Sequence, residues 1–66
     1  MSSKRKTVEM AASDVRHQFR QVINQVMSGT DVLVTRYGDV EAVMVNPSWY
    51  DSAIRALKAL EAAADQ

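Results

Sequence analysis

The stretch Asp31–Tyr50, DVLVTRYGDVEAVMVNPSWY, decides the fold that the sequence predicts. Two runs of alternating residues, Asp31–Tyr37 and Val40–Asn46, flank the dipeptide Gly38-Asp39. A glycine that opens a two-residue loop favours a type II′ turn, so we expect a β-hairpin. The dipeptide Asn46-Pro47 then predicts the cap and the first residue of a helix.

This turn predicts a strand register in which Arg36 lies opposite Glu41. One face of the hairpin then carries Leu33, Thr35, Tyr37, Val40, Ala42 and Met44. The other face carries Val32, Val34, Val43 and Val45. An antiparallel sheet usually leaves one polar face in water, whereas both faces here are apolar. We therefore expect the chain's own helices on one face and a second copy on the other, with the four valines as the dimer interface.

The chain has 66 residues and no cysteine, which predicts one small domain without disulfides or a thiolate metal site. A domain of this size buries only about 60% of the surface of its unfolded chain, so oligomerisation is a common remedy. We divide it into a basic arm (1–6), a core (7–46) and a C-terminal helix (47–66). No apolar run approaches the ~20 residues that span a bilayer, and no apolar leader is present, so we expect a cytoplasmic protein.

The formal net charge is zero, but the charges are unevenly distributed. Residues 1–20 hold five cations and two carboxylates, which gives +3, and residues 21–66 hold three cations and six carboxylates, which gives −3. This division suggests two partners of opposite character, although terminal charges can also serve solubility alone.

The short segment Thr7–Met10 alternates between polar and apolar residues and is a candidate third strand. The residues after it are spaced as in a helix. Ser13 is a suitable N-cap with Asp14 in the first turn, and Gly29 suits the left-handed position after the last turn, so we expect a helix over 13–28. Its apolar stripe comprises Val15, Phe19, Val22, Ile23, Val26 and Met27. The predicted class is α+β, in the order β-α-β-β-α with a small antiparallel sheet.

No catalytic constellation is apparent. The single histidine, His17, has only Ser13 and loop hydroxyls near it in sequence, and the carboxylates show no metal-ligand spacing. We expect no enzyme activity, no metal and no cofactor.

Binding to duplex DNA is a better hypothesis, because DNA requires cations for phosphates and a protruding element for base edges. Arg16 is expected in the first turn of the helix and Arg36 near the hairpin tip. The arm adds Lys4, Arg5 and Lys6. Each cation has an alternative role: Arg16 could pair with a nearby acid, Arg36 could face Glu41, and the arm could be solvated.

Several of these segments, in this order and spacing, resemble the Phd/YefM family of type II antitoxins. The motifs are a small polar residue and an arginine in the first helix, Val-x-x-Gly, a strand ending in Thr-Arg-x-Gly, Ala-Val-Met-Val and Pro-x-x-Tyr. In this sequence they are Ser13–Arg16, Val26–Gly29, Asp31–Gly38, Ala42–Val45 and Pro47–Tyr50.

The resemblance, over about residues 7–55, implies a homodimer that binds palindromic operator DNA and represses its own operon. It implies that Arg16 and Arg36 contact DNA, with Ser13 and Arg20 beside them and the arm on phosphates. An arginine bidentate to guanine is worth about 1–3 kcal/mol of discrimination.

The family also implies a C-terminal segment that binds and blocks a cognate toxin. Many relatives carry a longer extension than the one that ends here at Gln66, so toxin neutralisation would rest on the helix over 47–66. Its candidate anchors are Trp49, Ile54, Leu57 and Leu60, and Trp49 could equally serve the core or the dimer. The alternative to the antitoxin hypothesis is a dimeric module that binds no DNA and only sequesters a protein partner.

Overall fold

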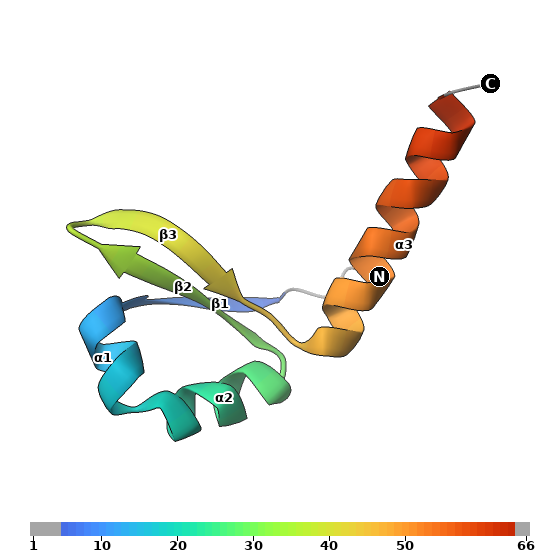
Figure 1. Ribbon diagram of the computed structural model, residues 1–66. Coiled ribbons are helices and arrows are strands. Elements are labelled where there is room, and N and C mark those ends of the chain that lie inside the picture. The colour runs from blue at the N-terminus through green and yellow to red at the C-terminus, as the bar shows by residue number, and fades with distance from the viewer. Residues whose placement is uncertain (1–4, 65–66) are drawn as a thin grey trace.

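The protein is seen in a computed structural model that describes residues 5–64. Strands and helices form one small α+β unit, as the sequence predicts (Figure 1). In chain order the elements are β1 (Lys6–Ala11), α1 (Ala12–His17), α2 (Phe19–Met27), β2 (Thr30–Arg36), β3 (Asp39–Met44) and α3 (Pro47–Ala64).

The three strands form one sheet in the order β1-β2-β3. The segment Thr7–Met10 lies within β1, which confirms the third strand. The expected antiparallel sheet is wrong, because β1 runs parallel to β2 and only β2 and β3 are antiparallel. The reason is topological: α1 and α2 connect β1 to β2 as a crossover, and a helical crossover joins parallel strands.

The hairpin forms, but its register differs from the expected one. The turn is Tyr37-Gly38 rather than Gly38-Asp39, and both residues have positive φ (53° and 83°), as in a type I′ turn. Arg36 is therefore opposite Asp39, not Glu41. A bulge beside Val34 and Thr35 then adds one residue to β3.

The new turn shifts the pairing by two residues and so keeps the faces of β3, but the one-residue bulge exchanges the two faces for the residues that follow it. Val32 now shares a face with Met44, and Leu33 shares the opposite face with Val43. Val32 is 0% exposed and belongs to the core, together with Val15, Val22 and Val26. Val8, Met10, Val34 and Met44 pack against this cluster. Val32 and Val34 therefore face the chain's own helices, and the prediction that Val32 forms part of a dimer interface is wrong because this residue is fully buried.

The helix expected over 13–28 is broken at Gln18 into α1 and α2. Its first capping position is Ala11 without a side-chain cap, so the prediction that Ser13 is the N-cap is wrong. The break also turns the side chain of Phe19 away from the core, so that it is 54% exposed. Gly29 does adopt the left-handed conformation, with φ of 107°.

The C-terminal helix, α3, begins as predicted. The Ser48 N–H donates to Asn46 Oδ1 at 2.8 Å, which is the N-cap bond, and Pro47 is the first helical residue. None of the residues of α3 is buried, and the helix points away from the sheet and from α1 and α2 (Figure 1). Within residues 5–64, no helix has the length and apolar character needed to cross a membrane.

Candidate nucleic-acid interface and partner surfaces

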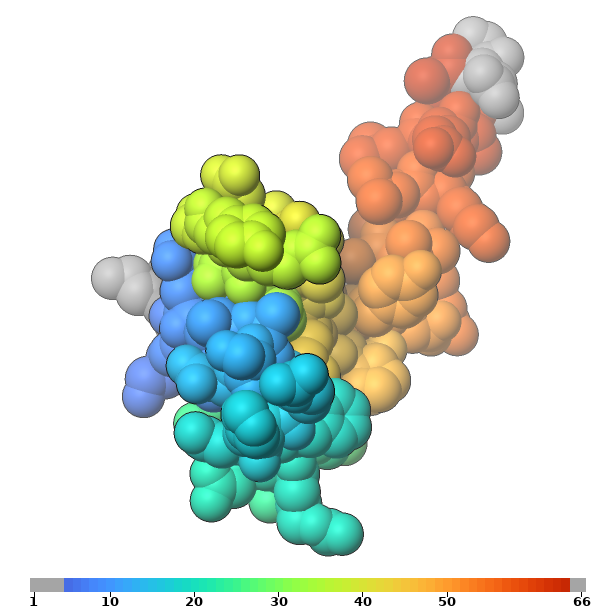
Figure 2. Space-filling model, turned by 60° about the vertical axis from the view of Figure 1, so that its left-hand side comes forward, coloured from blue at the N-terminus to red at the C-terminus, as the bar shows by residue number. Residues whose placement is uncertain are grey.

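One end of the molecule combines the hairpin tip with the start of α1. The parallel register places Ala11, the last residue of β1, beside Thr35 near the end of β2. Since α1 follows β1 directly, its first turn lies next to the tip. A hollow of about 340 Å³ separates them, and Figure 2 shows this end of the molecule facing the viewer. Its lining residues are Ala11, Ala12, Ser13, Thr35, Arg36, Tyr37 and Gly38.

Two of the predicted DNA-binding residues, Ser13 and Arg36, thus meet in this hollow although they are distant in sequence. Arg16 follows Ser13 by three residues on α1, a spacing that puts side chains on the same helix face. It lies in the last turn of α1 rather than the first turn, because the helix begins at Ala12 and ends at His17. Its side chain is exposed, and within residues 5–64 it makes no ion pair.

Arg36 pairs with Glu41, as the alternative interpretation held. Its Nε lies 3.2 Å from Glu41 Oε1, and both side chains are about half exposed or more. The guanidinium also lies 6.0 Å from the centroid of the Tyr37 ring. Exposed pairs of this kind are worth only about 0–1 kcal/mol, so Arg36 can exchange Glu41 for another acceptor at small cost.

Tyr37 is a candidate contact residue that the sequence reasoning missed. Its φ of 53° is unusual for a bulky residue, and its side chain is 95% exposed at the tip. Such left-handed strain often marks functional positions. Alternating residues alone could not indicate it, because the expected turn placed Tyr37 within a strand.

The charges at this end are balanced. Arg16, Arg20 and Arg36 lie on α1, α2 and β2, and they are matched in number by Asp14 on α1 and by Asp39 and Glu41 on β3. Arg20 is exposed on α2 and lines a separate shallow hollow with Phe19, Ile23 and Asn24. DNA affinity at this end would therefore depend on particular contacts more than on a strong positive field.

The basic arm lies at the other end of the sheet. Lys4 falls outside the described residues, and Lys6 is exposed at the start of β1. Arg5 precedes β1 and forms an ion pair with Asp31, so it lies about 20 Å from the hairpin tip by the length of a six-residue strand. The structure therefore does not group Arg5 and Lys6 with Arg16 and Arg36.

Among the described residues, Arg5 and Asp31 form the ion pair whose pKa values depart most clearly from their ordinary values. Arg5 Nε donates to Asp31 Oδ2 at 2.8 Å, and Nη2 donates to Oδ1. These hydrogen bonds hold the pKa of Asp31 below its ordinary value and raise the pKa of Arg5. Both groups are thus charged at neutral pH.

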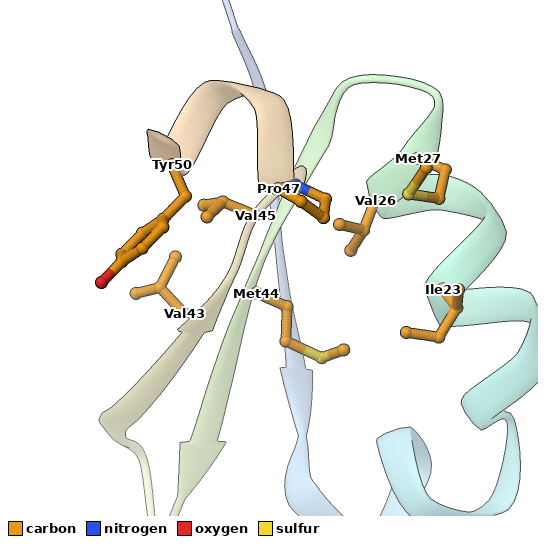
Figure 3. Close-up of a pocket in the computed structure, with 8 residues that line it drawn as sticks. All are labelled: Ile23, Val26, Met27, Val43, Met44, Val45, Pro47 and Tyr50. Carbon is orange, nitrogen blue, oxygen red and sulfur yellow. The ribbon is translucent and has the colours of Figure 1, made fainter. Parts of the chain in front are cut away.

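A second, apolar groove opens between α2 and the segment that joins β3 to α3. It has a volume of about 580 Å³. Its lining residues are Ile23, Val26, Met27, Val43, Met44, Val45, Pro47 and Tyr50. Figure 3 shows Val43 and Tyr50 on one side, Ile23 and Met27 on the other, and Met44 pointing across. Of the four valines expected at a dimer interface, Val43 and Val45 line this groove.

The candidate toxin-binding residues lie on α3. Trp49, Leu57 and Leu60 are exposed, and Ile54 is half-buried. An apolar stripe with alternating three- and four-residue spacing runs along the helix, a pattern that suits packing against another helix. It comprises Tyr50, Ala53, Leu57, Leu60 and Ala64.

Across residues 5–64, no group of three or more histidines, cysteines or carboxylates is placed to hold a metal ion. The chain matches no protein-family model, and no curated protein or solved structure is similar enough to it to count as a match. The resemblance to Phd/YefM antitoxins therefore rests on the sequence motifs alone.

Proposed function

We propose that this protein is a homodimeric, sequence-specific DNA-binding repressor and the antitoxin of a type II toxin–antitoxin system, acting in the cytoplasm. The observation that carries the DNA-binding part is the meeting of Ser13 with Arg36 and Tyr37 at one exposed end, with Arg16 one helical turn away. Hydroxyl, guanidinium and aromatic groups are the side chains that contact phosphates and base edges.

The chemistry divides naturally between these residues. Arg16 and Arg36 present forked donors that match the O6 and N7 acceptors of guanine in the major groove. Ser13 supplies a hydroxyl suited to a phosphate oxygen. The hairpin tip is narrow enough to enter the groove, since a two-stranded ribbon fits there.

A second copy is proposed to cover the apolar groove lined by Met27, Val43 and Tyr50. The chain exposes 5440 Å², whereas a compact protein of its mass exposes about 4,200 Å². The excess of roughly 1,200 Å² includes the projecting α3 as well as the groove, and a stable complex buries ~800 Å² on each partner. A two-fold dimer would repeat Arg16 and Arg36 and so favour a palindromic site.

The antitoxin part rests on α3. Beyond Tyr50, which lines the groove, its apolar stripe is uncovered, and the charged residues around it are mixed in sign. An amphipathic helix with exposed anchors suits insertion into a groove on a protein partner. Ile54, Leu57 and Leu60 are the proposed anchors for the toxin, whereas the ring of Trp49 lies against Arg5 at the base of the helix.

The alternative is a dimeric module that binds only protein. The Arg36–Glu41 ion pair favours it, because this arginine already has an acceptor. The balanced charge at the hairpin end favours it as well.

Selection from a pool of random DNA duplexes at low salt tests the proposed function. A repressor dimer would enrich a palindromic sequence, and its affinity would fall linearly with salt on logarithmic axes because bound counterions are released. If no sequence is enriched and no duplex binds at low salt, the protein-binding module is the better description.

A further inference from the structure

Three side chains from distant parts of the sequence stack at the base of α3. The Arg5 guanidinium lies between the Asp31 carboxylate, to which it donates two hydrogen bonds, and the Trp49 ring. Its central carbon is 4.4 Å from the centroid of that ring. The side chain of Arg5 is 29% exposed and that of Asp31 14%, so the stack is partly shielded from water.

Arginine is suited to this place because it uses two surfaces at once. The edge of the planar guanidinium offers a fork of donors to the carboxylate, and its face packs on the aromatic ring. A lysine ammonium keeps the charge but cannot supply the fork and the flat face together. Asp31 is the second residue of the central strand β2, so the stack ties Trp49 to the sheet.

The rest of α3 has little to hold it. The helix has 18 residues and buries none of them. At about 1.5 Å per residue it is roughly 27 Å long. Besides the stack, the hydrogen bond from Asn46 Nδ2 to the Met27 carbonyl oxygen, at 3.3 Å, ties its cap to the end of α2. Both attachments lie at or before the first turn, so the direction of the whole helix depends on them.

We propose that Arg5 is a positioning residue for α3: through Trp49 it fixes the direction in which the helix presents its apolar stripe to a partner. Arg5 is thereby withheld from DNA, in contrast to the role expected of it as part of the basic arm. Only the identity of the partner rests on the proposed function; the positioning of the helix does not.

Distance measurements between two spin labels test this proposal without DNA or a partner protein. The chain contains no cysteine, so labels can be placed at Asp39→Cys, on the hairpin tip, and at Lys58→Cys, on α3. Labelled protein is diluted with unlabelled protein so that only distances within one chain are read. The parent is expected to give one narrow distance distribution, and Arg5→Gln a distribution at least twice as wide.

Matched variants separate positioning from general stability. Lys6→Gln removes a neighbouring exposed cation and should leave the distribution narrow. Trp49→Leu keeps the Arg5–Asp31 pair and should widen the distribution as Arg5→Gln does, which provides a second reading if Arg5→Gln fails to fold. Arg5→Lys should widen it in part.

Narrow, parent-like distributions for Arg5→Gln or, if that variant is unfolded, for Trp49→Leu would overturn the proposal. So would widening by Lys6→Gln equal to that of Arg5→Gln, since any lost cation would then suffice. The test measures distances only and does not depend on DNA binding. Its result can therefore be interpreted even if the proposed function is wrong.

Discussion

Arg36 and Glu41 form an ion pair at 3.2 Å although they are not cross-strand partners. Arg36 lies opposite Asp39, and the bulge in β3 displaces Glu41 from the ladder. The carboxylate is thus a competitor for the arginine that we propose to contact DNA. Whether the pair limits DNA binding is open to a direct test.

Replacing Glu41 by glutamine is expected to strengthen duplex binding. The change keeps the shape of the side chain but removes the charge that competes with phosphate or guanine for Arg36. Since an exposed pair is worth about 0.2–1 kcal/mol, the expected gain in affinity is at most about fivefold, and about 1.4-fold at the lower end. Fluorescence anisotropy with the selected duplex measures it, with Glu61→Gln on α3 as the control. Equal or weaker binding by Glu41→Gln would show that the pair does not restrain Arg36.

Tyr37→Asn should stabilise the fold and weaken DNA binding. Asparagine tolerates the left-handed conformation better than tyrosine, and Asn-Gly is a preferred type I′ turn. We expect a gain of roughly 0.5–1 kcal/mol in the free energy of unfolding, measured by denaturant titration. The aromatic ring is lost at the same time, so duplex affinity should fall. Unchanged affinity would remove Tyr37 from the interface.

Met27→Lys should separate the dimer. Met27 is 57% exposed in the single chain, so the substitution does not disturb its own core, but a second copy over the groove would bury an unpaired charge. Analytical ultracentrifugation should show monomers for this variant and dimers for the control Leu60→Lys on the distal part of α3. A dimer that survives Met27→Lys must use another surface.

The pair of Arg5 and Asp31 should make stability depend on acidity. Because the pKa of Asp31 is lowered in the folded protein, the pair stabilises the fold above the unfolded-state pKa of about 3.9 and loses this effect as the pH falls through the lower, folded-state value. The melting temperature of the parent should therefore exceed that of Asp31→Asn at pH 6, and the difference between the two melting temperatures should narrow below about pH 5. A difference independent of pH would mean that the charge of Asp31 is not responsible.

Much of the fold follows from local sequence signals. The Asn46-Pro47 helix start and the left-handed Gly29 are confirmed because each depends on a backbone geometry that few residues satisfy. The hairpin and the third strand, which alternating residues predict, are also confirmed.

The register of the hairpin could not be derived in the same way. Alternating valines fit either register equally well, and Gly38 can be either the first or the second residue of the turn. A tyrosine with positive φ and a bulge are both poorly indicated by sequence. The tyrosine moves the turn, and the bulge reverses the facing of Val43. A continuous apolar stripe likewise gives no sign of the break at Gln18, so the sequence wrongly predicts Phe19 in the core.

The candidate site was predicted in part. The sequence indicates Arg16, Arg36 and Ser13 as separate candidates, and the parallel pairing of β1 with β2 brings Ser13 and Arg36 to one hollow. The same pairing carries Arg5 to the opposite end, where a contact with Asp31 and Trp49 depends on residues far apart in sequence. No local pattern indicates such a contact.

Duplex binding by Arg16→Ala and Arg36→Ala tests most directly whether the hairpin end reads DNA. Each variant should keep the far-ultraviolet circular dichroism and the dimer of the parent, while its affinity for the selected duplex falls about 5- to 150-fold, as expected for the loss of one bidentate base contact of about 1–3 kcal/mol. Arg55→Ala, on α3, should bind like the parent. If both Arg16→Ala and Arg36→Ala bind the selected duplex as tightly as the parent does, the DNA-binding site lies elsewhere and the proposed interface is wrong.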